Sequence, residues 1–399
     1  MLGGESVRKT GLRTAAYCEA DLNARQVTRR ASFARRAHRH TGGRARLIAA
    51  LLIALGLLAS AGCAPLQRGP ITITATPLPD VIGPGGLLPS INPLTGLAVD
   101  DPAVLARRPL AAKISNAPDA VRPQAGIAQA DLVFEHLTEG PLTRFTAIFW
   151  THTPPRLGSI RSARLIDLEI PAMYDTLLVY SGASEPIRRK IAGLPFANRA
   201  YEGVTVGAPL YYRDTSIEVP HNLFAVPRAV WARAEADGVN RPRADLGGMR
   251  FSATPPGGPP ARTITIDYGG DEVEWTYDEA SGRYARRVDG APHTDANTGE
   301  QVTAANIVLI YAHHQPDLAI VESQWQGSMS FSIELQIWTL GPAAIFRDGV
   351  QTTGYWHRWQ EEDMLTFWAD EDRAAPLYLK PGNTWFEIVP LDFTALTVQ

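Results

Sequence analysis

The sequence predicts an α+β protein, with a layered α/β domain followed by a mostly antiparallel β domain. Apolar runs typical of strands alternate with helical patterns over residues 95–250. Residues 263–395 consist instead of alternating, β-rich segments separated by turn residues. Between them, residues 251–262 contain a run of proline and glycine that cannot form a helix or a central strand. We therefore expect two domains joined by a linker.

In the first domain, short apolar runs predict strands and helix-start signals predict helices. A proline such as Pro227 suits the first turn of a helix, because its fixed φ and missing N–H cost nothing there. The predicted strands are Leu110–Ile114, Leu132–Leu137, Phe145–Trp150 and Leu177–Tyr180. The predicted helices are Ser162–Tyr174, Glu185–Ala192 and Pro227–Ala236.

In the second domain, alternating segments are separated by turn residues such as Arg347-Asp348-Gly349 and Pro381-Gly382-Asn383, which favours an antiparallel sheet. We expect most tryptophans of this domain to lie in its core, with Trp356 as the candidate for a surface contact. The predicted strands are Thr263–Ile266, Glu272–Tyr277, Arg283–Val288, Asn306–Tyr311, Phe331–Thr339, Ala344–Phe346 and Trp385–Val389.

The N-terminal residues 1–63 resemble a secretory signal of the lipoprotein type. An arginine-rich leader precedes an uncharged run that begins at Leu47 and ends in small residues before Cys63. That run is shorter than the roughly 20 residues of a spanning helix. Residues 64–94 are rich in proline and glycine and predict a flexible tether. We expect a lipid anchor at Cys63 on the extracytoplasmic face of the cell membrane; cleavage with secretion and an uncleaved membrane anchor are the alternatives.

The charge distribution argues against a nucleic-acid partner. Residues 1–46 hold 11 of the 38 Lys and Arg residues and 3 of the 41 Asp and Glu residues, and residues 47–63 hold none. Residues 64–399 therefore carry 27 basic and 38 acidic side chains, a formal charge of −11. Binding to nucleic acid needs a basic face. The chain has only two cysteines, Cys18 and Cys63, so the exported part cannot form an internal disulfide.

The densest polar cluster begins on the predicted strand Leu132–Leu137. The two-residue period of a strand places Glu135 on its apolar face, where an unpaired carboxylate would be costly. Glu139 and Arg144 follow on either side of a Gly-Pro turn. These residues are the candidates for one side of a polar site.

Two arginines at the predicted start of helix Ser162–Tyr174 are the candidates for the other side. Arg161 and Arg164 are three residues apart and would share one helix face. Together with free N–H groups and with Ser162, which suits a cap, they could hold an anion.

Two interpretations of this cluster remain open. It is either a buried ion-pair network of Glu135, Arg144, Arg161 and Asp167, or a binding or catalytic site. Arginine recognises carboxylates and phosphates but stays protonated, so binding is favoured over proton transfer.

A second group of polar residues follows at Arg213, His221 and Asn222. His221 could act as an acid, a base or a metal ligand, or simply form hydrogen bonds within a loop. The chain contains no GxSxG elbow, HExxH zinc helix or Walker loop. We expect no metal and no cofactor.

Several sequence blocks identify a family. They read NPLTG at 92–96, RPQAGIAQADLVFE at 122–135, EGPLTRF at 139–145, IRSAR at 160–164, HNLF at 221–224 and, further on, FRDG, GYW and PGNTWFEIVP. With these blocks the chain resembles the YerB-like bacterial lipoproteins, which have paired N- and C-terminal domains of unknown function. The resemblance implies a two-domain body, a membrane lipoprotein and a shared pocket of Glu135, Arg144, Arg161, Ser162, Arg164, His221 and Asn222. It implies no activity.

The leading functional expectation is a non-catalytic, membrane-anchored protein that binds a polar or anionic ligand of the cell envelope. The first alternative is a hydrolase of envelope glycan or peptide that uses Glu135 or Glu139 with His221, since paired carboxylates can cleave glycosidic bonds. The second is a scaffold for envelope assembly, with another protein bound through Trp356.

Overall fold

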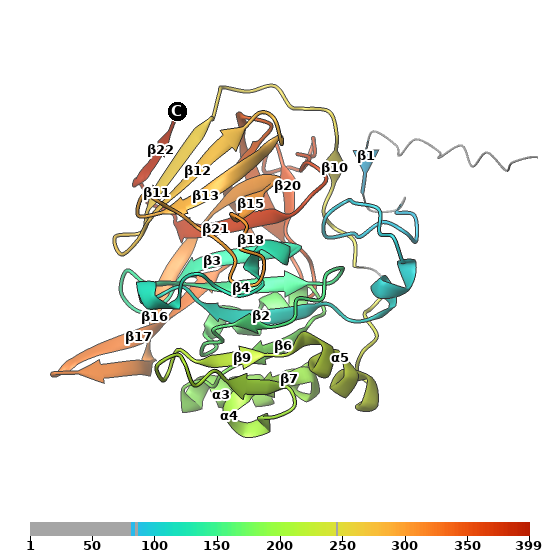
Figure 1. Ribbon diagram of the computed structural model, residues 1–399. Coiled ribbons are helices and arrows are strands. Elements are labelled where there is room, and N and C mark those ends of the chain that lie inside the picture. Colours follow the sequence, from blue (N-terminus) through green and yellow to red (C-terminus); the bar gives the residue numbers. More distant parts are fainter. Residues whose placement is uncertain (1–80, 84–86, 245) are drawn as a thin grey trace, which may run out of the picture. The chain divides into compact units, whose positions relative to one another are not determined.

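Figure 1 shows the computed structural model, which describes residues 81–83, 87–244 and 246–399. The described residues belong to one compact unit. The predicted leader, the signal with Cys63 and the first part of the tether lie outside the described residues. Within the described ranges, no helix has the length and apolar character needed to cross a membrane.

The end of the predicted tether belongs to the folded body. Strand β1 (Val81–Ile82) pairs with β10 (Phe251–Ser252), which lies inside the predicted linker 251–262. Asn92 is buried and its side-chain amide donates a 2.8 Å hydrogen bond to Asp131. Both ends of the first predicted domain are therefore tied into the fold.

One mixed sheet of eleven strands includes strands from both predicted domains (Figure 1). Its strands are β2 (Leu110–Ser115), β3 (Leu132–Leu137), β4 (Thr143–Phe149), β6 (Leu177–Tyr180), β7 (Ala200–Glu202), β16 (Asn306–Trp325), β17 (Ser328–Gln336), β18 (Thr339–Arg347), β19 (Val350–Arg358), β20 (Thr366–Trp368) and β21 (Thr384–Pro390). Their order is β20-β19-β18-β16-β21-β3-β4-β2-β6-β7, with β17 on β16 outside this path. The two predicted domains meet where β21 pairs in parallel with β3, with Glu387 opposite Glu135.

Two further sheets are formed largely by strands that lie between those of the large sheet in the sequence. The first has the order β14-β13-β12-β11-β22 with β15 on β13, and the second the order β5-β9-β8. Their bounds are β11 (Thr263–Asp267), β12 (Glu272–Asp278), β13 (Arg283–Val288), β14 (Ala291–Pro292), β15 (Thr303–Ala304), β22 (Leu396–Val398), β5 (Leu157–Gly158), β8 (Tyr211–Arg213) and β9 (Leu223–Ala225).

The described helices are few and short. The α-helices are α2 (Ile170–Met173), α3 (Glu185–Ala192), α4 (Gly203–Val206) and α5 (Pro227–Ala236). The 3₁₀ helices are η1 (Pro102–Ala106), η2 (Asp119–Val121), η3 (Ile127–Gln129), η4 (Leu165–Leu168) and η5 (Ala197–Arg199). The predictions for α3 and α5 are confirmed at both ends. The α+β class is confirmed in its coarser form, a mostly stranded protein, whereas the layered α/β arrangement of the first domain is not confirmed.

The predicted helix Ser162–Tyr174 is wrong over its first part. The Arg161 amide donates to the Lys113 carbonyl, and the Arg161 carbonyl accepts from the Ser181 amide. This is the hydrogen-bond pattern of neighbouring strands. Arg164 keeps an extended backbone with φ −130° and ψ 176°. Backbone pairing with neighbouring strands thus outweighs local helix propensity, and helical turns begin only at η4.

The predicted strand Phe331–Thr339 is in fact two strands. β17 ends at Gln336 and β18 begins at Thr339, which has a positive φ of 72°. A residue with positive φ interrupts an extended backbone. The residues around it are apolar, so nothing in the sequence indicated that the strand ends there. After this reversal β18 pairs in antiparallel fashion with the earlier strand β16. β16 is far longer than the predicted Asn306–Tyr311.

The central strands of the large sheet, such as β2 and β6, are buried on both faces. In β2 successive residues alternate between two hydrophobic clusters, with Leu110 and Ala112 in one and Ala111 in the other. All six residues of β2 are buried. A strand covered on both sides reads as a continuous apolar run, which explains why these strands were visible in the sequence.

The surface role predicted for Trp356 is wrong. Its side chain is 1% exposed and its Nε1 donates a 2.9 Å hydrogen bond to the Tyr311 carbonyl. Gly341 makes room for it, because a Cβ at that position would lie 2.7 Å from the indole nitrogen. The scaffold hypothesis loses the residue on which it was based.

Candidate functional site

Glu135 lies in the interior and not in an open site. Its carboxylate is fully buried and accepts a 2.5 Å hydrogen bond from Arg286, which lies on β13. Thr143 and Asn116 donate to its other oxygen at 2.8 and 3.2 Å. The need for a partner was correctly predicted, but the partner comes from the second predicted domain.

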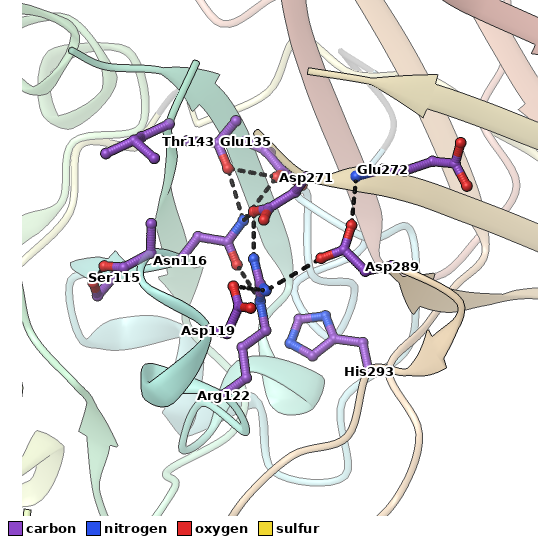
Figure 2. A network of polar contacts seen from close by, with 12 residues as sticks. Ser115, Asn116, Asp119, Arg122, Glu135, Thr143, Asp271, Glu272, Asp289 and His293 are labelled. Carbon is purple, nitrogen blue, oxygen red and sulfur yellow. Dashed lines mark hydrogen bonds and ion pairs between the residues drawn. The ribbon is translucent and has the colours of Figure 1, made fainter. Parts of the chain in front are cut away.

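Beside Glu135, a network of polar side chains surrounds Arg122 (Figure 2). Its guanidinium contacts the carboxylates of Asp119 at 3.0 Å, Asp289 at 3.7 Å and Asp271. The three carboxylates lie close enough together to resemble a cation site. The guanidinium supplies their positive charge, so the network is explained as a set of ion pairs.

A pocket of about 420 Å³ brings four of the predicted site residues together. We call it the arginine pocket. It lies where the extended segment before η4, the loop after β6 and the long strand β16 meet. Its lining includes Arg161, Ser162, Arg164, Ser181, Ser184, Arg188, Arg213 and Glu322.

Most of the charge at the inner end of the arginine pocket is neutralised. Arg164 binds Glu139 through two nitrogens, with Nε at 3.0 Å from Oε2, and lies 3.5 Å from Glu322. Arg144 lies 3.6 Å from Glu139 and donates to the Ser162 carbonyl at 2.8 Å. Although burial opposes ionisation, Arg164 and Arg144 lower the pKa of Glu139 to about 2. Glu139 is thus a fixed anion, unsuited to proton transfer at neutral pH.

Arg161 has no such partner. Its guanidinium forms no hydrogen bond and no ion pair with any described residue. Partial burial and the nearby charge of Arg164 lower the pKa of Arg161. An arginine that is partly desolvated and repelled by its neighbour has unused capacity for an anion.

The predicted loop residues divide between two places. Arg213 is exposed and donates a 2.7 Å hydrogen bond to Asn222, so Asn222 orients it toward the arginine pocket. His221 lines a different pocket, of about 220 Å³, with Arg156 and Ser159. Burial and Arg161 lower the pKa of His221.

The hydrolase hypothesis is wrong in the form that the sequence suggested. It needs Glu135 or Glu139 to share an open cleft with His221. Glu135 is buried against Arg286, Glu139 is paired with Arg164, and His221 lines a separate pocket.

A buried cluster behind the arginine pocket was missed by sequence reasoning. Lys113 Nζ lies 2.6 Å from His136 Nε2, 2.9 Å from Asp167 and 3.0 Å from Thr146. Asp167 thus pairs with Lys113 and not with an arginine side chain, and it also accepts from the Arg164 amide at 2.7 Å. Burial lowers the pKa of Lys113 to about 8, an effect that Asp167 opposes. The signal for this cluster was a lysine within an otherwise apolar strand.

The fold and the pocket define an α+β protein in which an N-terminal and a C-terminal part share one sheet beside an arginine-lined pocket. The chain belongs to the family described as "Protein of unknown function (DUF3048)". The model of the N-terminal domain matches residues 94–240 and that of the C-terminal domain matches residues 264–386.

The sequence and the crystal structure of one relative, YerB of Bacillus subtilis, agree with this assignment. The chain is 29% identical over 316 residues to "Putative lipoprotein YerB" of Bacillus subtilis (strain 168), which covers 77% of this chain and 88% of the relative. The crystal structure of the YerB protein from Bacillus subtilis matches with a TM-score of 0.66 and 27% identity, over 77% of this chain and 99% of that one. The resemblance found in the sequence is confirmed.

Proposed function

We propose that this protein is a lipoprotein, held through Cys63 at the extracytoplasmic face of the cell membrane, that binds a polar or anionic ligand of the cell envelope in the arginine pocket. The similarity to a relative named as a lipoprotein supports the anchor. Binding, without catalysis, is supported by a pocket rich in arginine side chains, which recognise anions and do not transfer protons.

The unpaired guanidinium of Arg161 is the observation that carries the proposal. Its neighbour Arg164 is fixed by Glu139 and Glu322, so the pocket is preorganised before any ligand enters. Arg213 provides a second exposed cation at the pocket mouth. Hydroxyl donors complete the lining, with the Ser162 and Ser181 oxygens 3.5 Å apart. Such a set of donors suits a phosphate or a carboxylate.

We expect Arg161→Met to weaken binding of inorganic phosphate about tenfold or more, since a hydrogen bond to a charged group contributes about 1.5–3 kcal/mol. The free energy of unfolding of the free protein should not fall, because Arg161 has no partner to lose. Isothermal titration and urea unfolding measure the two quantities.

The matched control is Arg189→Met, because Arg189 is an exposed arginine on α3 outside the arginine pocket. Arg189→Met should bind inorganic phosphate with the same affinity as the unmodified protein. Equal phosphate binding by Arg161→Met and Arg189→Met would contradict the proposal, as would the absence of any binding to the unmodified protein.

The anchor has its own test. Mass spectrometry of the mature protein from membranes should find Cys63 as the N-terminal residue, with a diacylglyceryl group on its sulfur. An unmodified residue other than Cys63 at the N-terminus would exclude the lipid anchor.

A further inference from the structure

A second pocket, of about 540 Å³, lies between segments that are far apart in the sequence. Its lining comes from the chain before and within η1, from residues 128–131 before β3, from the loop after β4, from β13 and from the turn before β21. It shares no lining residue with the arginine pocket. Because both halves of the chain contribute, the pocket exists only in the complete fold.

Arg283 is a cation of this second pocket, and its hydrogen-bond partners within the described part of the chain are neutral. It donates to the Thr303 hydroxyl at 2.8 Å, to the Thr303 carbonyl at 3.1 Å and to the Asn383 side-chain oxygen at 2.6 Å. Its Nη1 has no hydrogen bond with a described residue. Burial lowers the pKa of Arg283, and no carboxylate offsets this effect. A partly buried charge without a counter-charge is costly.

Acidic side chains lie elsewhere on the wall, and none forms an ion pair with Arg283. Asp100 and Asp101 are exposed. Asp101 caps η1 by accepting from the Ala103 amide at 2.9 Å, and the Asp100 carboxylate has no partner among the described residues. Asp131 is buried, and the amides of Asn92 and Trp150 occupy its oxygens at 2.8 and 2.6 Å. The pocket thus has a free positive group at one place and a free negative group at another.

The rest of the lining mixes apolar residues, such as Leu97, Val99, Val104 and Ala128, with polar ones that include Gln129 and His152. The volume of this pocket lies within the usual range for small-molecule sites, about 300–1,000 Å³. A doubly charged phosphate would be repelled by the acidic wall, whereas a carboxylate with an ammonium group elsewhere in the same molecule would be matched at both ends.

We propose that this second pocket binds a small zwitterionic ligand, an amino acid or short peptide, with its carboxylate at Arg283 and its ammonium group at Asp100. The apolar wall would contact aliphatic side chains of the ligand. This inference does not depend on the function proposed for the arginine pocket.

The test is isothermal titration of the full chain with the unblocked dipeptide Ala-Ala, its C-terminal amide and its N-acetyl form. The unblocked dipeptide should bind, and each blocked form should bind about tenfold more weakly, because each loses one charge-assisted hydrogen bond. Inorganic phosphate should not displace the dipeptide. Failure of the unblocked dipeptide to bind at millimolar concentration, equal binding of the blocked forms, or displacement by phosphate would each overturn the inference.

Variants locate the site. Arg283→Met and Asp100→Asn should each weaken dipeptide binding about tenfold. Because Asp100 is exposed and unpaired, Asp100→Asn keeps the fold intact even if Arg283→Met does not. Arg287→Met, on the same strand but outside this pocket, is the matched control. If Asp100→Asn binds the dipeptide as tightly as the unmodified protein, the placement of the ammonium group at Asp100 is wrong.

The same variants separate the two proposals. Arg161→Met should bind the dipeptide as well as the unmodified protein, and Asp100→Asn should bind phosphate as well as the unmodified protein. Loss of dipeptide binding in Arg161→Met would place the dipeptide in the arginine pocket and overturn the inference.

Discussion

Arg286→Met is expected to lower the free energy of unfolding by about 3–5 kcal/mol, the usual cost of removing one partner of a buried ion pair. The measurement is urea unfolding at neutral pH, followed by tryptophan fluorescence. The expectation rests on the burial of both partners, since Arg286 and Glu135 have no exposed side-chain surface.

The surroundings of Arg286 leave Glu135 no substitute partner. Its guanidinium lies 2.7 Å from His293 Nδ1 and within 5.0–5.7 Å of the ring centres of Phe145, Trp275 and Trp385. Burial is the main cause that lowers the pKa of His293, and it persists in the variant, so we expect His293 to stay neutral at pH 7 and not to replace the lost charge. Methionine fills the space but leaves a buried anion.

Two controls test this account. Arg287→Met, on the same strand with a side chain 39% exposed, should change the free energy of unfolding by less than about 0.5 kcal/mol. Combining Glu135→Gln with Arg286→Met should recover much of the loss, because the buried charge is then removed. If the single and double variants are equally unstable, lost packing and not the unpaired charge explains the effect.

The elements that could be predicted are those whose sequence pattern matches their surroundings. β6 is apolar and buried on both faces, β3 is so apart from Glu135 and His136, and α3 and α5 begin with a proline in the first turn. The segment 162–174 misled because its pattern is helical, whereas Arg161 just before it pairs with the backbone of Lys113 and Ser181, and Ala163 donates to the Gly182 carbonyl. Nothing local in the sequence reports such pairing.

The candidate site could be predicted in composition but not in arrangement. Arg161 and Arg164 do share a pocket, as their spacing suggested, although no helix begins there. The partner of Glu135 lies 151 residues away in the sequence, and Glu322 reaches Arg164 only because β16 is so long. Contacts of that separation depend on how the sheet is assembled, which spacing does not encode.

The join between the two halves of the sheet places a second carboxyl group beside Glu135. Glu387 lies opposite it on β21 and is fully buried. Tyr268 and Trp275 donate to its two oxygens at 2.7 and 3.0 Å. Arg286 binds Glu135 directly and is the cation that both carboxyl groups face. One positive charge for two buried carboxyl groups favours the protonated form of one of them.

Burial, and then the charge of Glu135, raises the pKa of Glu387 to about 8, from an ordinary value near 4.5 in the unfolded chain. As the pH rises, Glu387 therefore loses its proton in the unfolded chain before it does so in the folded protein. The stability present below pH 4.5 is lost as the pH rises toward 8. The loss is about 3 kcal/mol by pH 7, taking about 1.4 kcal/mol per pKa unit.

Glu387→Gln, which cannot ionise, should lack this dependence and should be more stable than the unmodified protein at pH 8. Urea unfolding at intervals from pH 4.5 to 8 measures the difference, with Glu272→Gln, an exposed glutamate on β12, as the matched control. Parallel pH profiles for Glu387→Gln and the unmodified protein would show that Glu387 is ionised in the folded state and that the core holds both charges.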